Sequence, residues 1–165
     1  MRASVPQPQV ESEPVASPAA TAAPAFPNLL AHLPIPFQGV DYAVKGYHVE
    51  ATVAPDQVVT VARQLDEDGL ALDTITGVDW MAEDQMEVVY DYFHPARTLR
   101  VVVRTRIPRA NPEVATIQGV FPGANWHERE THDFFGIRFL GHPNLTPFLL
   151  PEDADFHPLR KDYPA

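Results

Sequence analysis

Proline is the residue that most restricts what this chain can fold into. Of its 18 prolines, only Pro55 and Pro95 lie between positions 37 and 107, and the others gather toward the two ends. Proline lacks a backbone donor and is excluded from helix interiors and central strands. We therefore expect regular secondary structure mainly in the middle of the chain. The apolar segment 26–37, interrupted by three prolines, is expected to lie extended on a partner or on its own domain.

The ends and the middle of the chain also differ in composition. Residues 1–26 are mostly Pro, Ala, Ser and Gln with almost no large apolar side chains, which predicts a disordered leader. Residues 27–140 have the length of one α+β domain with a single core. Residues 141–165 contain five prolines but also aliphatic and aromatic side chains, which predicts an extended C-terminal interaction arm. We expect this arm to lie on a neighbouring subunit, and packing on its own sheet is the alternative.

The pattern of apolar residues predicts the elements of the middle segment. Strands are predicted over residues 47–53, 70–80, 86–93 and 99–107, with a turn at 94–97. Helices are predicted between Pro55 and Gly69, over residues 113–120, and from about Ala124 onward. A strand, a helix and then three strands favour an α+β fold, with a mixed or antiparallel four-stranded sheet and helices on one face.

The absence of cysteine excludes several kinds of chemistry. Without thiolates the chain cannot hold cysteine-ligated iron-sulfur clusters, structural cysteine zinc or disulfides. The net charge of −10 argues against nucleic-acid binding, which needs basic surface. No stretch approaches the roughly 20 apolar residues of a membrane span, and no glycine fingerprint for dinucleotides is present. We expect a soluble cytoplasmic protein that carries no redox cofactor itself.

The densest group of polar side chains, at residues 125–137, raises the question of a metal site. His127, Glu128 and His132 would serve a metal-dependent hydrolase, which we keep as a distant alternative. A zinc-protease helix has its histidines four positions apart, whereas a spacing of five places them roughly 140° apart around the helix. We therefore assign no catalytic and no metal-ligating residue.

Large aromatic side chains accompany the charges of this segment. Trp126 and Phe134 bracket a charged turn, and such aromatics normally require burial against another surface. Charged side chains beside buried aromatics are typical of a protein interface, and plain core packing is the alternative. His142 and His157 lie in the proline-rich arm and are interpreted as hydrogen-bonding anchors rather than catalytic bases.

Two blocks of sequence resemble a known family. Residues 126–141, WHERETHDFFGIRFLG, and residues 149–164, LLPEDADFHPLRKDYP, are similar in order and spacing to the signature of the 30 kDa-type, or C-type, subunit of NADH-quinone oxidoreductase, which is respiratory complex I. The upstream runs LDTITGVDW and MEVVYDYF also resemble strands of the family. The resemblance therefore covers about residues 45–165.

The resemblance implies a function for the chain. It implies a structural subunit in the hydrophilic part of a proton-translocating complex, packed on the large subunit that shapes the quinone site and contacting quinone only indirectly. FMN and iron-sulfur clusters are then expected in partner subunits, and the location is the cytoplasmic face of the bacterial inner membrane. The alternative is the equivalent subunit of a membrane-bound energy-converting nickel-iron hydrogenase or formate hydrogenlyase. The chain departs from the family pattern at Thr131, His132 and Phe134, but these differences are too mild to separate the two kinds of complex.

The resemblance also implies roles for particular residues. The charges of segment 125–137 are expected to position its helix at the interface, and the charges after residue 156 to anchor the arm. The predicted interface residues are Trp126, Glu128, Arg129, Glu130, Asp133, Phe134, His142, His157, Arg160, Lys161, Asp162 and Tyr163.

Overall fold

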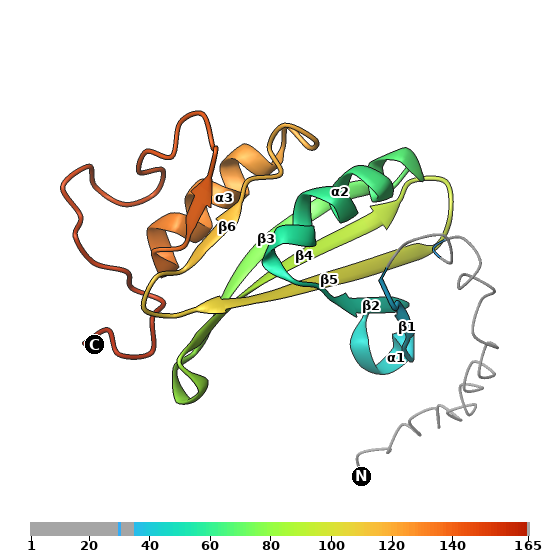
Figure 1. The fold of residues 1–165 in the computed structure, drawn as a ribbon, viewed down its shortest axis with the longest axis horizontal. Helices are drawn as coiled ribbons and strands as arrows, with labels where there is room; N and C mark the ends of the chain where they lie inside the picture. The colour runs from blue at the N-terminus through green and yellow to red at the C-terminus, as the bar shows by residue number, and fades with distance from the viewer. Residues whose placement is uncertain (1–29, 31–34, 165) are drawn as a thin grey trace, which may run out of the picture.

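The computed structural model describes residues 30 and 35–164 (Figure 1). The leader predicted for residues 1–26 lies outside the described residues. Within the apolar segment that follows it, Leu30 and Ile35 are buried in the core of the domain. These two residues therefore pack on their own domain.

A mixed five-stranded sheet forms the framework, with one strand more than predicted. Its strands are β1 (Gln38–Gly39), β2 (Val49–Thr52), β3 (Ala71–Trp80), β4 (Gln85–His94) and β5 (Leu99–Pro108), in the order β1-β2-β5-β4-β3. The β2–β5 pair is parallel and the other three pairs are antiparallel. The four predicted strands are confirmed. The additional strand, β1, is only two residues long, and so short a segment shows no detectable periodicity.

β4 and β5 form a long hairpin, as the turn at residues 94–97 predicts. Their ten-residue strands pair without a break. Alternation directs one row of each strand into the core, where Tyr90 and Tyr92 are buried. The other row points away from the core, and there Arg100, Arg104 and Arg106 of β5 pair with carboxylates of β2, β3 and β4.

The first predicted helix is confirmed as a 3-10 turn, η2 (Pro55–Gln57), followed by α2 (Val58–Glu67). The side chains that α2 buries share one helical face; they are Val58, Val61, Ala62 and Leu65. Gly69 follows with a left-handed φ of 80°, as expected of a glycine that ends a helix. Two single-turn helices, α1 (Tyr42–Lys45) and η3 (Met81–Glu83), lie in connections between strands.

The helix predicted for residues 113–120 is wrong. The segment begins instead with β6 (Glu113–Ala115), which pairs in parallel with β7 (Arg138–Leu140) as a second, two-stranded sheet. Val114 and Thr116 are β-branched and favour extended backbone, and the Thr116 amide continues the pairing with β7. Since β7 follows more than twenty residues later in the sequence, the local pattern could not reveal this partner.

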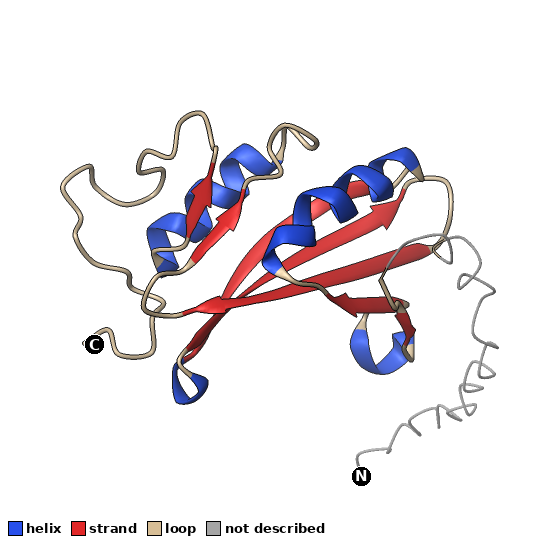
Figure 2. Ribbon diagram, in the orientation of Figure 1, coloured by secondary structure: helices blue, strands red, loops and turns tan. Residues whose placement is uncertain are grey.

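The helix expected from Ala124 onward is α3 (Ala124–Phe135), and it packs against β3. The Thr131 hydroxyl donates to the Ile75 carbonyl of β3 at 3.4 Å, and the Phe135 ring lies directly against Gly77. α2 and α3 lie over the same face of the sheet, as predicted (Figure 2). In the described part of the chain no helix is long and apolar enough to cross a membrane.

Candidate functional site

The two sequence blocks that carry the family resemblance meet at the C-terminal end of α3. The arm, which is described over residues 141–164, loops outward after β7 and returns past α3 (Figure 1). Gly136 ends α3 with a left-handed φ of 72°, and its amide donates to the His132 carbonyl. The last carbonyls of a helix have no partner within it and need donors from elsewhere.

The arm supplies these donors. Three of its groups donate to three successive carbonyls in the last turn of α3. They are His157 Nδ1 to the Asp133 carbonyl (2.8 Å), the Leu159 amide to the Phe134 carbonyl (3.1 Å) and Arg160 Nε to the Phe135 carbonyl (2.7 Å). The His-Pro-Leu-Arg run therefore caps α3, with its histidine and arginine side chains as two of the three donors.

Gly136 lies beneath this cap and leaves no room for a side chain. A Cβ atom at this position would lie 2.5 Å from both His157 Nε2 and the Arg160 guanidinium. The positive φ and the close approach both require glycine. The glycine between the two blocks is therefore part of the contact between helix and arm.

Asp133, a predicted interface residue, fastens an earlier part of the arm. Its side chain is buried, and its Oδ2 accepts the amides of Phe148, Leu149 and Leu150 at 2.9, 2.7 and 3.1 Å. Burial by itself raises the pKa of a carboxyl, but the three amides and nearby His132 hold the pKa of Asp133 below its ordinary value. The carboxylate therefore remains ionised and ties this part of the arm to α3.

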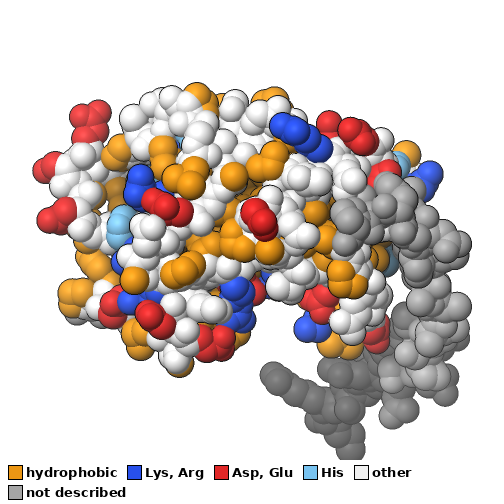
Figure 3. All heavy atoms as spheres, in the orientation of Figure 1, with side chains coloured by type: hydrophobic (Ala, Val, Ile, Leu, Met, Phe, Trp, Pro, Cys, Tyr) orange, Lys and Arg blue, Asp and Glu red, His pale blue; other side chains and the backbone are white. Residues whose placement is uncertain are grey.

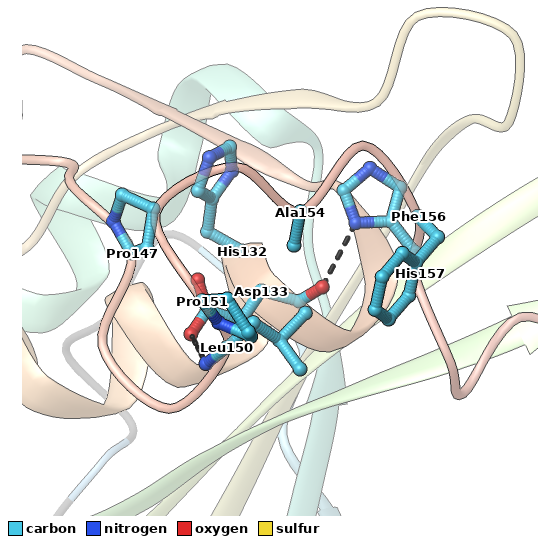
Figure 4. A pocket seen from close by; sticks show the side chains of 8 residues that line it. All are labelled: His132, Asp133, Pro147, Leu150, Pro151, Ala154, Phe156 and His157. Atoms are coloured by element: carbon cyan, nitrogen blue, oxygen red, sulfur yellow. Dashed lines mark hydrogen bonds between the residues drawn. The ribbon is translucent and has the colours of Figure 1, made fainter.

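A small cavity lies between α3 and the arm, and Figure 4 labels the side chains that line it. The dashed lines there mark bonds of Asp133 with Leu150 and His157. The cavity has a volume of about 50 Å³, whereas substrate pockets are typically several hundred Å³. It is a space for a few water molecules at most and gives no support for a substrate site.

The end of the arm is fastened to β3 through an ion pair. Arg109 donates to both carboxylate oxygens of Asp79, at 2.8 and 3.0 Å, and also to Asp162 at 2.6 Å. The Lys161 amide donates to Asp79 as well, at 2.9 Å. Hydrogen bonding from Arg109 holds the pKa of Asp79 below its ordinary value. Asp79 and Arg109 were not predicted as site residues. The available signal was the place of Asp79 in the inward-facing row of β3 that also contains Ile75.

Glu128 lies on the buried side of α3, and its side chain has no exposed surface. Its carboxyl group accepts the Thr116 hydroxyl at 2.5 Å and the Ile117 amide at 2.8 Å. Burial raises the pKa of Glu128 to about 7, although both hydrogen bonds oppose this rise. His142, at the start of the arm, lies with Nε2 3.9 Å from Glu128. Glu128 therefore positions α3 through contacts within the chain.

The remaining predicted interface residues of α3 lie nearer the surface. Arg129 donates to two backbone carbonyls of the arm, at residues 146 and 147, and its guanidinium lies over the Phe148 ring. Glu130 and Phe134 are half-buried beside a groove between α3 and β3. Their role at an interface with another subunit stays a prediction.

Large apolar side chains of α3 and the arm point outward. This outward apolar set consists of Trp126, Phe148, Leu149, Phe156, Leu159 and Tyr163. Trp126 is 57% exposed, so the burial expected of this aromatic does not occur within the chain. Acidic side chains lie along the outer edge of the arm, at the left of Figure 3. The arm thus uses several of its polar groups for contacts with its own domain, while these six side chains stay partly exposed, together with the acidic ones.

Two of the three residues of the hydrolase alternative make separate contacts. Glu128 faces Thr116 in the interior, and His132 Nδ1 donates to the Ile137 carbonyl at 2.9 Å. Across residues 35–164 and at residue 30, no group of three or more metal-binding side chains is arranged to hold an ion. Nothing in this geometry favours a metal-dependent hydrolase.

The fold and the site define a class of protein: a small α+β subunit whose C-terminal arm is fixed to its own last helix and presents apolar side chains outward. Residues 51–165 match the family described as respiratory-chain NADH dehydrogenase, 30 Kd subunit. The chain belongs to this family, as the two sequence blocks predict. It is therefore a complex I-type subunit of an oxidoreductase assembly.

Individual relatives agree with this family. The C-type subunit of NADH-quinone oxidoreductase from Roseiflexus sp. (strain RS-1) is 44% identical over 117 residues, which cover 68% of this chain and 67% of that protein. Among solved structures, the membrane-bound sulfane sulfur reductase, an archaeal respiratory membrane complex, contains a chain with a TM-score of 0.72 and 27% identity, covering 83% of this chain and 82% of that one. A trypsin-resistant fragment of Nqo5 matches with a TM-score of 0.54 and 25% identity, covering 62% of this chain and 92% of the fragment.

Proposed function

We propose that this chain is a structural subunit of a proton-translocating NADH-quinone oxidoreductase, that it packs on the large quinone-site subunit, and that it binds no redox cofactor itself. FMN and iron-sulfur clusters would then reside in partner subunits. The complex would place this chain at the cytoplasmic face of the inner membrane, as a peripheral subunit. Family membership and the absence of cysteine support this proposal.

One observation carries the choice of docking surface: several polar groups of the arm bond within the chain, whereas the side chains of the outward apolar set remain exposed. His157, Arg160 and Asp162 are bonded to α3 or to Arg109. The outward apolar set lies on the same arm and on the adjacent helix. Protein interfaces are enriched in aromatic and apolar side chains at their centre, and exposed groups of this kind mark association surfaces.

Substitutions in the outward apolar set test this proposal. Burying a fully exposed leucine contributes roughly 1.5–3 kcal/mol. Leu149 and Leu159 are 54% and 53% exposed, so Leu149→Ser and Leu159→Ser should each weaken assembly about three- to tenfold. Val44→Ser is the matched control, because Val44 is 77% exposed but lies on α1, away from the arm. The measurement is co-purification of each variant with the other subunits, together with thermal unfolding of the isolated chain. Equal recovery of all three variants contradicts the proposed docking surface.

A second candidate function is the same structural role in another respiratory membrane complex. The likeness to a chain of the archaeal sulfane sulfur reductase favours it, because that assembly is not named as an NADH dehydrogenase. The nickel-iron hydrogenase alternative belongs to the same group. Mass spectrometry of the intact complex separates these functions. A flavin-bearing NADH-oxidising subunit supports the first, a complex without that subunit supports the second, and a nickel-iron subunit identifies the hydrogenase form of the second. Flavin or iron bound stoichiometrically to the isolated chain contradicts the cofactor-free role.

A further inference from the structure

A buried pair of titratable side chains lies where the arm begins. Glu128 on α3 and His142 just after β7 have no exposed side-chain surface, and Glu128 Oε2 lies 3.9 Å from His142 Nε2. That distance is too long for a hydrogen bond, yet a movement of about 1 Å would close it. The pair therefore has an open geometry that a small shift converts into a direct bond.

The backbone fixes the tautomer of His142. The Asn144 amide donates to His142 Nδ1 at 3.1 Å, so Nδ1 acts as an acceptor and carries no proton. The ring proton of the neutral imidazole is then on Nε2, the atom that faces Glu128. No hydrogen bond of ordinary geometry joins this nitrogen to a described residue, but the backbone of Asn125 interacts with the imidazole as a hydrogen-bonding partner and raises its pKa. A buried N–H group whose partner is poorly placed favours a better-placed acceptor nearby.

The charge on Glu128 decides whether it can act as that acceptor. Burial raises the pKa of Glu128 to about 7, against the hydrogen bonds from Thr116 and Ile117. Burial lowers the pKa of His142, and Arg129 and His132 on α3 lower it further, although the Asn125 backbone opposes them. The pKa of the imidazole therefore lies below its ordinary value while the pKa of the carboxyl group lies above its own, so the carboxyl group is the member of the pair that titrates near pH 7.

The other groups that face the pair come from β4. Tyr90 and Tyr92 are buried there, and burial raises the pKa of both hydroxyls, with Glu128 contributing to each rise. Both tyrosines are consequently neutral near pH 7. The segment after β6 contributes the uncharged Thr116 hydroxyl. Among the described residues of these two elements no charged group acts on the pair, so its charged or titratable neighbours are Arg129 and His132 of α3.

We propose that Glu128 and His142 form a proton-controlled latch at the start of the arm. With the carboxyl group neutral, the pair stays open at the observed separation. When Glu128 releases its proton to solvent, the carboxylate accepts the Nε2–H of His142 in a charge-assisted hydrogen bond of about 2.8 Å. The closed latch joins α3 directly to the start of the arm. This latch concerns the chain alone and holds whether or not the arm docks on the proposed partner subunit.

Side-chain nitrogen NMR of the full chain between pH 5.5 and 8.5 tests the latch. We expect the neutral form of His142 to be the Nε2–H tautomer, and its Nε2–H proton to shift downfield with one midpoint near pH 7. In Glu128→Gln this midpoint should disappear, because no carboxyl group remains to ionise. The matched control is Glu130→Gln, which removes a half-buried carboxylate of the same helix and should leave the midpoint in place. A His142 midpoint that persists in Glu128→Gln, or an Nδ1–H tautomer, overturns the latch.

A second variant keeps the test decisive if Glu128→Gln does not fold. Thr116→Val removes the hydroxyl donor that favours the ionised form of Glu128. The His142 midpoint should then move to higher pH by about one unit. An unchanged midpoint in Thr116→Val also overturns the latch.

Discussion

Asp133→Asn tests whether a single charge holds the arm on α3. The substitution keeps the shape of the side chain and one oxygen acceptor, but it removes the charge that faces the amides of Phe148, Leu149 and Leu150. Hydrogen bonds to a charged group contribute about 1.5–3 kcal/mol each, against about 1 kcal/mol for neutral ones. Because neutral bonds can remain in the variant and the effects are not additive, we expect a net loss of about 1–3 kcal/mol in the free energy that docks the arm.

Hydrogen exchange of the arm amides measures this loss directly. A loss of 1–3 kcal/mol corresponds to exchange roughly 5 to 150 times faster at residues 148–150, while the amides of the β4–β5 hairpin should change little. The control is Asp155→Asn, which alters an exposed carboxylate of the arm. Unchanged protection at residues 148–150, or equal acceleration throughout the sheet, would refute the assignment of a docking role to this charge.

The same charge gives arm docking a defined dependence on pH. The pKa of Asp133 is lowered in the folded state, so its contribution is present above the ordinary value of 3.8 and is lost as the pH falls through the lowered value. Wild-type amides at residues 148–150 should therefore lose protection in an acid step below pH 3.8. The Asn variant should show no such step.

Three further substitutions have definite expected outcomes. Gly136→Ala should destabilise the chain by about 2 kcal/mol or more, because position 136 has a positive φ and a Cβ there would collide with His157 and Arg160. Its control in thermal unfolding is Gly123→Ala, which should be nearly neutral because φ is −62° and no atom lies within reach of an added Cβ. Arg109→Gln leaves the buried Asp79 without its ion-pair partner and should cost about 3 kcal/mol in denaturant unfolding; a loss below about 1 kcal/mol contradicts this. Because the pKa of Glu128 is raised in the folded state, the free energy of unfolding of the wild type should fall by on the order of 3 kcal/mol as the pH rises from about 4.5 to about 7. Unfolding curves of Glu128→Gln recorded across the same pH range should not show this fall.

The elements that the sequence predicts correctly are those with local signals. The β4–β5 hairpin consists of two apolar, β-branched runs with a short turn between them, and both its strands and its turn are where the pattern indicates. α2 has four buried side chains at helical spacing and a glycine just beyond its end. In these cases the information lies within a window of about ten to twenty residues.

The missed features depend on partners far away in the sequence. β6 becomes a strand because β7 is placed beside it across α3. Arg109 lies 30 residues from Asp79 and 53 from Asp162, and a pattern of single residues gives no sign that these three meet. The site residues were found through family resemblance, but the resemblance did not show that Asp133 and Arg160 bond to the arm and to α3 of the same chain.

This internal bonding changes how the interface prediction should be understood. Association costs free energy for every flexible segment that must be ordered, and a segment that is already held in its bound shape avoids much of that cost. Asp133, His157 and Arg160 hold the arm at three points before any partner is present. Substituting them should therefore lower assembly by loosening the arm, even though none of them needs to touch the partner. Substituting Leu149 or Leu159 should instead lower assembly while the arm stays docked, and exchange protection at residues 148–150 distinguishes the two causes.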